Sequence, residues 1–287
     1  MESIDIYDCA STHALLPLLN DTNELVELET DDFLKIFAFM PGLSHVNLRF
    51  AGQMKDEVLE YMMDRNLKVQ FLQLDAPNLV SEECWRRFFQ KSGSQLETVK
   101  LSNLDFSLDD ETVEEMCRSC PRLRRLKLEQ CWKLGDRSLQ AISTLTTLEH
   151  LSLDMVRAVE NDNLLEVVDK LGPNLRTLAL EGFPAADDRL LEHIRNRCRV
   201  LTKLRFTNNA VCTDKGFTSL FQGWPNPPLE HVDFSATRDV DNANADGPDD
   251  PVGLSSEGFI ALMEHSEAAI QTLNIASCRH VSHDAFE

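Results

Sequence analysis

Apolar residues recur along this chain in a fixed short pattern. The clearest copy is LRRLKLEQC at residues 123–131, with Leu at the first, fourth and sixth places and Cys at the ninth. That spacing is the consensus of a leucine-rich repeat. The first apolar residue of each copy is Leu43, Val69, Leu96, Leu123, Leu148, Leu175, Leu201, Leu229 or Ile270. Seven of the eight steps between copies are 25 to 28 residues long, which predicts an array of repeats.

Each copy predicts a short strand followed by a helix. Because side chains alternate between the two faces of a strand, the fourth and sixth places point into the core and the third and fifth point away from it. Apolar residues three and four apart then favour a helix, as in LLEVVDKL at residues 164–171. One copy cannot bury its apolar face, so neighbouring copies must stack. We predict the α/β fold class: a leucine-rich-repeat solenoid (horseshoe) of the cysteine-containing type, with a parallel sheet on the concave face and helices on the convex face.

Acidic residues gather where these helices are predicted to begin. Asp136 and Asp214 are predicted N-caps, since a short oxygen-bearing side chain satisfies a free N–H group there. A run of acids at residues 109–115 also falls at a helix start, where the helix dipole favours negative charge. We interpret this run as a solvated outer face.

The repeat array predicts one domain covering residues 1–287, because a solenoid grows by adding units. Met1, Ile4, Ile6 and Cys9 already fit the repeat spacing, so the chain begins inside a strand. The last residues, HDAFE, fall early in a helix. Solenoid ends are normally covered by atypical capping units. We therefore expect that both ends are uncapped and that the chain is a fragment.

One repeat is longer than the others. The step from Leu229 to Ile270 is 41 residues, and the surplus forms an acidic inserted loop at residues 237–256. Insertions within single repeats emerge as surface loops that often bind partners, although a passive loop is an equal alternative. Its spacing does not match a calcium-binding loop. The candidate binding residues in the loop are Asp239, Asp241, Asp246, Asp249 and Asp250.

The charge balance narrows the classes of partner. The chain has 28 basic and 48 acidic residues, a formal net charge of −20, which disfavours attraction of the whole molecule to nucleic acid or anionic membrane. No apolar run approaches the roughly 18 residues that span a bilayer, and the first residues do not resemble a secretion signal. We expect an intracellular protein with no membrane partner.

Residues for catalysis, cofactors or metals are not evident in the sequence. It contains no GxSxG, GxxxxGK(S/T), HExxH or GxGxxG motif, so we predict a non-enzyme with no cofactor and no small-molecule substrate. Cys117 and Cys120 have CxxC spacing, and Cys278 precedes His280 and His283. The cysteines follow the repeat pattern, however, so we expect reduced, mostly buried thiols and no metal site.

The outward-facing strand places carry an inverted charge. Eighteen such positions hold five Lys or Arg residues and one acid, although acids dominate the whole chain. Like charges on strands about 4.8 Å apart repel, so stability alone would not favour this arrangement. We predict a partner-binding concave face with these candidates: Lys100, Arg125, Lys127, His150, Lys203, Arg205 and His231. The alternative is that acids at the seventh strand place neutralise it: Asp75, Glu129, Asp154 and Glu181.

Two longer stretches extend beyond the generic repeat. They are GPNLRTLALEGFPAADDRLL, and residues 201–263 from LTKLRFTNNAVCTDKGF to GFIALM, with SCRHVS after them. Both resemble the carboxyl-terminal repeat region of the fungal radiation-sensitivity protein seven family, a leucine-rich-repeat subunit of the complex that finds damage in non-transcribed DNA for nucleotide excision repair. The resemblance covers nearly the whole chain and is most specific in the inserted unit.

The resemblance implies a nuclear, non-enzymatic scaffold. Its implied partners are a Snf2-type ATPase and, through elongin C and a cullin, a ubiquitin ligase of which it is a substrate-recognition part; damaged DNA is reached through the complex. The family's upstream cysteine-rich segment and ligase-docking box lie outside this sequence. Two alternatives remain: an F-box-type repeat receptor of an SCF ubiquitin ligase in cell-cycle or signalling control, and a GTPase activator built on the same solenoid.

Overall fold

The chain forms repeated strand and helix units in this computed structural model. The structure describes residues 3–6, 29–48, 51–104, 107–154, 159–209, 211–236, 252–278 and 280–286. These residues belong to two compact units, 1–134 and 135–287, which are described separately. The prediction of one domain over residues 1–287 stays a prediction.

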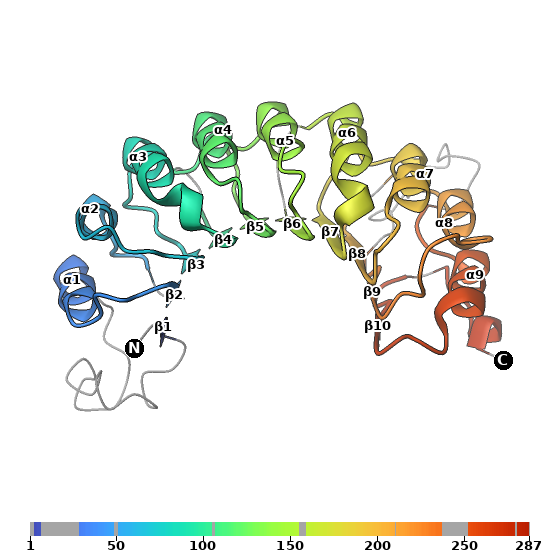
Figure 1. Cartoon of the computed structure of the whole chain (residues 1–287). Helices are drawn as coiled ribbons and strands as arrows, with labels where there is room; N and C mark the ends of the chain where they lie inside the picture. The colour runs from blue at the N-terminus through green and yellow to red at the C-terminus, as the bar shows by residue number, and fades with distance from the viewer. Residues whose placement is uncertain are drawn as a thin grey trace. The chain divides into compact units, whose positions relative to one another are not determined.

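In the first unit, parallel strands lie side by side in sequence order, and helices cover one side of them (Figure 1). The strands are β1 Ser3–Ile6, β2 His45–Leu48, β3 Phe71–Asp75, β4 Thr98–Ser102 and β5 Arg125–Glu129. The helices are α1 Thr30–Ala38, α2 Asp56–Asp64, α3 Glu82–Ser92 and α4 Asp110–Ser119. A short 3₁₀ turn, η3 at Gly93–Gln95, follows α3.

The second unit has the same organisation. Its parallel strands are β6 His150–Asp154, β7 Thr177–Glu181, β8 Lys203–Thr207, β9 His231–Asp233 and β10 Thr272–Asn274. Its helices are α5 Asp136–Ile142, α6 Asn161–Leu171, α7 Asp188–Arg197, α8 Asp214–Phe221 and α9 Ser256–Ser266. Two 3₁₀ turns are η4 Gly172–Asn174 and η5 His283–Phe286. The predicted leucine-rich-repeat fold is confirmed.

The core of each unit lies between its strands and its helices. In β5, Leu126 and Leu128 are at most 1% exposed, whereas Arg125 is exposed and Lys127 half-buried. The same alternation occurs in β3, β6 and β8. Since the side chains of the third and fifth places stay out of the core, they form a surface that we call the strand face of each unit.

A left-handed backbone residue ends most of the described strands. It occupies the eighth place of the repeat, as in Ala76 (φ 56°), Gln130 (φ 51°) and Gly182 (φ 73°). The N–H of Ala76 donates to Ser102 O at 2.9 Å, and that of Gly182 donates to Thr207 O at 3.0 Å. This conformation turns the chain away from the sheet and ties each repeat to the next, so it fixes the register of the strand-face side chains.

The helix starts differ from the prediction by one residue. Gly135 and Thr213 are the N-caps of α5 and α8, while Asp136 and Asp214 are the first helical residues. The predicted capping by these two aspartates is therefore wrong. The carboxylate of Asp136 instead accepts the N–H of Glu160, at the start of the next helix, at 2.8 Å. Each aspartate thus connects neighbouring helices, in addition to its favourable interaction with the helix dipole.

Candidate partner-binding surface

Repeat register brings the basic strand-face residues of the first unit together. Gln73 lies opposite Lys100, which in turn lies opposite Lys127. In the neighbouring row, Phe71 and Arg125 lie on either side of Thr98. Neighbouring strands are about 4.8 Å apart, so Lys100 and the two basic residues of β5 share one small area.

An aromatic side chain completes this area. The Phe71 ring stacks on His45 of β2, with centroids 5.9 Å apart and an interplanar angle of 14°. Lys100 Nζ lies 5.3 Å from the centroid of the same ring, within the range of a cation–π interaction. We name Phe71, Lys100, Arg125 and Lys127 the cation–aromatic cluster. The sequence prediction omitted Phe71 from this site, although the third-place register of β3 and β4 could have identified it.

Like charges in the cluster are only partly compensated. Lys127 Nζ lies 2.6 Å from Glu129 Oε1, whereas Asp75 accepts hydrogen bonds from Ser102 at 2.8 Å and Asn103 at 2.5 Å. Across the described part of the chain, Lys100 and Arg125 have no carboxylate within ion-pair distance. Burial, followed by repulsion from the basic residues of β5, lowers the pKa of Lys100. An incoming anion would relieve that repulsion.

The strand face of the second unit combines imidazole, hydroxyl and ammonium groups. Lys203 lies between Thr177 and His231 in one row across the sheet. His150 Nδ1 is 2.9 Å from the hydroxyl of Thr177, and His231 Nδ1 is 2.8 Å from the hydroxyl of Thr272. These hydroxyls orient both rings, while the ammonium of Lys203 remains exposed.

The charge of Arg205, the other basic strand-face residue of β8, is neutralised by two acids. Its Nη2 lies 2.6 Å from Glu181 Oε2, and its Nε lies 3.5 Å from Asp233 Oδ2. The alternative that acids neutralise the basic residues therefore applies to Lys127 and Arg205. It does not apply to Lys100, Arg125 or Lys203 among the described contacts.

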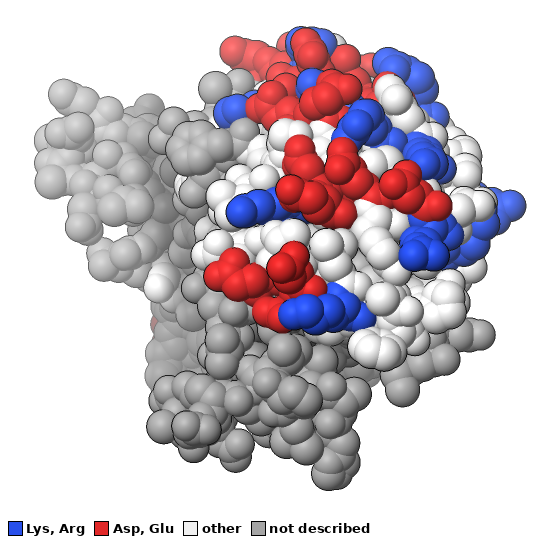
Figure 2. Space-filling model, turned by 90° about the vertical axis from the view of Figure 1, so that its left-hand side faces the viewer, with Lys and Arg blue, Asp and Glu red and all other residues white. Residues whose placement is uncertain are grey.

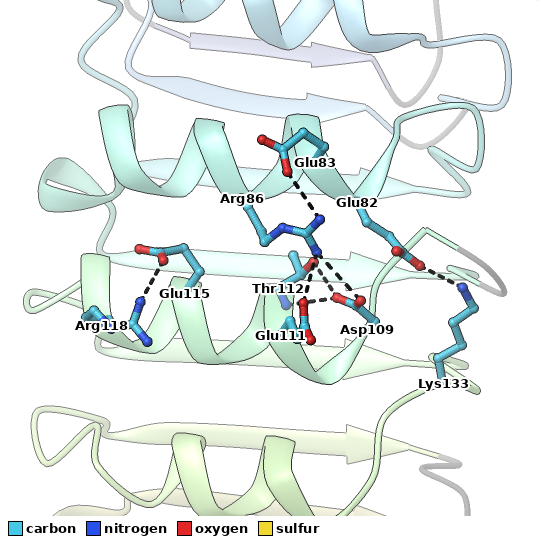
Figure 3. A network of polar contacts seen from close by, with 9 residues as sticks. All are labelled: Glu82, Glu83, Arg86, Asp109, Glu111, Thr112, Glu115, Arg118 and Lys133. Carbon is cyan, nitrogen blue, oxygen red and sulfur yellow. Dashed lines mark hydrogen bonds and ion pairs between the residues drawn. The ribbon is translucent and has the colours of Figure 1, made fainter.

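The helix layer has a different charge pattern. On the side of the molecule that lies at the left of Figure 1, Figure 2 shows acidic groups interspersed with Lys and Arg. In the first unit, Arg86 of α3 lies 3.2 Å from Glu83, 3.6 Å from Asp109 and 3.9 Å from Glu111 (Figure 3). This network joins α3 to the start of α4. Each basic side chain drawn in Figure 3 forms an ion pair with at least one acid of the same unit.

Two acids of this region are structural, contrary to the interpretation of a solvated outer face. Asp109 is the N-cap of α4, and its Oδ1 accepts the N–H of Thr112 at 2.9 Å. Glu115 is buried, with hydrogen bonds from Ser119 and Arg118 at 2.7 Å each. The sequence pattern could not distinguish these roles from simple exposure.

Several buried cysteines lie in environments that oppose thiolate formation. Burial raises the pKa of Cys120 and of Cys198 to about 12 each, and raises the pKa of Cys117 further. The thiol of Cys278, which is only partly buried, donates to Phe234 O at 3.1 Å. Within the described residues, no three His, Cys, Asp or Glu side chains converge on a position for a metal ion. None of the described helices has the length and apolar character needed to span a bilayer.

The inserted loop is described only at its carboxyl end. Val252 forms an antiparallel bridge with Thr213, and Gly253 N–H donates to Cys212 O at 2.8 Å. The loop therefore returns to the chain beside the start of α8. The candidates Asp239, Asp241, Asp246, Asp249 and Asp250 lie outside the described residues, so their role stays a prediction.

Several known proteins are similar to this chain in sequence. The chain is 26% identical over 200 residues to DNA repair protein rhp7 of Schizosaccharomyces pombe, covering 69% of this chain and 35% of that protein. It is 24% identical over 168 residues to DNA repair protein RAD7 of Saccharomyces cerevisiae, covering 54% of this chain and 28% of that protein. The chain is homologous to these two repair proteins. The resemblance expected from the inserted unit is thereby confirmed.

A third relative shows a similar level of identity. The F-box/LRR-repeat protein 4 of Bos taurus is 28% identical over 196 residues, which cover 66% of this chain and 31% of that protein. The chain thus spans about a third of the length of the curated relatives that it matches. No family model matches the sequence.

A solved structure has the same fold. It is the yeast Rad7 and Elc1 complex, which matches with a TM-score of 0.53 and 19% identity, covering 90% of this chain and 75% of that one. At this identity the match establishes the repeat architecture. It agrees with the strand and helix order observed in each unit.

Proposed function

We propose that this chain is the repeat part of a non-enzymatic protein-binding scaffold that acts in DNA damage recognition during nucleotide excision repair. The observation that carries the proposal is the homology to two DNA repair proteins, rhp7 and RAD7. The fold is consistent with it, because repeat solenoids expose long surfaces that bind proteins. The protein would work in the nucleus, where its substrate is.

The proposed partners belong to a cullin ubiquitin ligase and to a repair complex. The structure with the same fold contains Rad7 together with Elc1, an elongin C, which supports elongin C as a partner of the complete protein. A cullin and a Snf2-type ATPase complete the proposed assembly, by resemblance to the same family. This chain would supply substrate recognition, and damaged DNA would be reached through the complex.

The strand faces are the proposed contact surfaces, with the inserted loop as an additional one. The basic residues Lys100, Arg125 and Lys203 keep their charge exposed or only half-buried, so they can attract an acidic partner. His150 and His231 add oriented ring nitrogens. Surfaces of this kind raise association rates and define which partner fits.

A cellular experiment tests this proposal. In cells lacking the gene, the complete protein is expected to restore survival after ultraviolet irradiation and to copurify with elongin C. Changing Arg125, Lys127, Lys203 and Arg205 to Glu is expected to reduce survival, while elongin C capture, which the resemblance assigns to a separate docking box, should persist. Failure of the unaltered protein to restore survival would refute the repair function, whereas full activity of the altered protein would refute only the role of the strand faces.

An F-box-type receptor of an SCF ubiquitin ligase is the second candidate function. It is favoured by the 28% identity to F-box/LRR-repeat protein 4. Under this alternative the complete protein would copurify with SCF subunits in place of elongin C, and ultraviolet survival would not depend on it. The copurification experiment therefore distinguishes the two candidates.

A further inference from the structure

The most distinctive feature of the described strand faces is the cation–aromatic cluster of the first unit. In the second unit, Arg205 is held between two acids. In the first unit, Lys100 and Arg125 have no comparable partner within the described residues, and only Lys127 does. The seven basic and imidazole residues predicted from the sequence are therefore not equivalent.

We propose that the cation–aromatic cluster binds an extended acidic segment of a partner protein, with Phe71 as the apolar contact beside the charges. This inference rests on the proposed scaffold function and specifies the chemistry of one partner. Arg125 and Lys127 are two residues apart on β5. Alternate residues of an extended peptide are also roughly 6.6 Å apart, so carboxylates at every second position match this spacing.

Lys100 strengthens the match. It lies opposite Lys127 on the neighbouring strand, so one carboxylate above β4 and β5 would contact Lys100 and share Lys127 with Glu129. Burial and the charges of Lys127 and Arg125 lower the pKa of Lys100, and Glu129 offsets this only in part. A carboxylate placed there gains attraction and removes repulsion in the same step.

The surroundings favour an acidic peptide over nucleic acid. Asp75 and Glu129 lie on the same two outer strands of this area, two residues beyond Gln73 and Lys127. A duplex carries a charge about every 1.7 Å along its axis and would bring further phosphates against these acids. A short peptide presents its few carboxylates to Lys100 and Arg125 and brings no further charges along the strands. The chain's net charge of −20 also opposes a long polyanion.

Phe71 gives the cluster an apolar contact in a fixed position. Its ring lies between His45 on one side and Lys100 on the other, and it remains partly exposed. The ring is therefore held in place before a partner arrives. An apolar or aromatic residue next to the partner's acids can pack against it without additional ordering of the ring.

Fluorescence anisotropy with the purified 287-residue chain tests the proposal. The probe is a labelled peptide of alternating Asp and Ser residues with one central Leu, and the comparison peptide has Asn at every Asp position. Binding of the Asp peptide at least about tenfold tighter than the Asn peptide is expected, since each tenfold corresponds to about 1.4 kcal/mol. A duplex oligonucleotide is measured in parallel, and preferential binding of the duplex would overturn the proposal.

A matched pair of variants locates the binding. The double variant Lys100→Gln with Arg125→Gln removes two charges from the strand face, whereas Arg87→Gln with Lys91→Gln removes two from α3. The first is expected to weaken Asp-peptide binding about tenfold, the second by less than about twofold. Equal weakening by both would indicate general electrostatics and overturn the proposal. So would unchanged affinity of the first variant, provided that thermal unfolding shows that it is folded.

The peptide assay is independent of the cellular test. Normal ultraviolet survival and elongin C capture by the Lys100→Gln/Arg125→Gln variant, together with lost peptide binding, would keep both the repair function and the site. Absence of Asp-peptide binding by the unaltered chain would overturn the site and leave the repair function standing.

Discussion

Asp188, the first residue of α7, accepts two hydrogen bonds from Thr213, the N-cap of α8. The distances are 2.7 Å to the backbone N–H and 2.6 Å to the hydroxyl. The relationship recurs between Asp56 and Ser81, with both distances at 2.6 Å. One carboxylate thereby supports the start of its own helix and holds the cap of the following one. The same device thus connects at least one pair of neighbouring repeats in each unit.

We expect Asp188→Ala to lower the free energy of unfolding by about 1–3 kcal/mol. The substitution leaves the N–H and the hydroxyl of Thr213 without their charged acceptor. Asp162→Ala is the matched control: Asp162 lies 3.1 Å from Arg189, but its side chain is 80% exposed, so a loss below about 1 kcal/mol is expected. Urea unfolding of both variants measures the difference. Equal losses would contradict the assigned role of Asp188.

Gly216 allows this contact to form. A Cβ atom at Gly216 would lie 2.1 Å from Asp188 Oδ1, a separation that requires one of the two groups to move. Gly216→Ala should therefore break the contact between α7 and α8 and lower the thermal unfolding midpoint by several degrees, for a loss of about 1–3 kcal/mol. At Gly42 a Cβ would meet nothing within 4 Å, so Gly42→Ala is the control. An unchanged midpoint for Gly216→Ala would show that the carboxylate moves without cost.

The sequence predicted the repeat fold more reliably than the contacts that join one repeat to the next. Apolar places one, four and six alternate with polar ones at a constant step, so strand, helix and buried residues followed from periodicity. The left-handed conformation at the eighth place could not be predicted from periodicity, because Ala76 and Gln130 adopt positive φ without being Gly. Asp136 and Asp214 were predicted as caps because their residue type fits a cap, and the type alone does not show which neighbouring repeat the carboxylate reaches.

The candidate site shows the same limit. Alternation placed Lys100 and Arg125 on the strand face, and the parallel register confirmed that they are neighbours. Whether a basic residue is neutralised depends on the direction of the nearby acidic side chain. Glu129 forms an ion pair with Lys127, whereas Asp75 accepts a hydrogen bond from Ser102. Both acids occupy the same repeat place, so the sequence treats them as equivalent.

Glu115 should make stability depend on pH in the acid range. The hydrogen bond from Ser119 is the main cause that lowers the pKa of Glu115 in the folded chain. A lowered folded pKa means that the stabilisation is present above the unfolded value of 4.5 and is lost as the pH falls through the folded value. Glu115→Gln should remove this contribution, so its unfolding free energy should fall less steeply below about pH 5. Identical slopes would contradict the assignment.

Buried thiols should resist alkylation. Burial raises the pKa of Cys120 and of Cys198 to about 12 each, so at about pH 8 almost none of either is thiolate, the reactive form. Iodoacetamide should modify both in urea but not in the native chain, as followed by peptide mass spectrometry. Cys278, which is only partly buried, should react first among the described cysteines. Fast native labelling of Cys120 would show that the α4 end opens readily.

The charge of Lys100 should contribute to partner binding and should not stabilise the fold. Burial and repulsion by Lys127 and Arg125 lower its pKa, so folding disfavours its charged form. The resulting loss of folding stability is fully present below the lowered pKa and falls as the pH rises above that value. Lys100→Met keeps a long side chain against Phe71 without the charge. We expect unchanged stability or a gain of up to about 0.5 kcal/mol near neutral pH, together with weaker Asp-peptide binding.

Lys127→Met is the contrast, because it removes the partner of Glu129 at 2.6 Å as well as the charge. That variant should lose a few tenths of a kcal/mol, up to about 1 kcal/mol, in urea unfolding. A loss of stability for Lys100→Met as large as that for Lys127→Met would mean that the cation over Phe71 supports the fold. Opposite signs for the two substitutions would instead show that the strand face of the first unit maintains an uncompensated charge at a cost to its own stability, as a surface adapted to an acidic partner must.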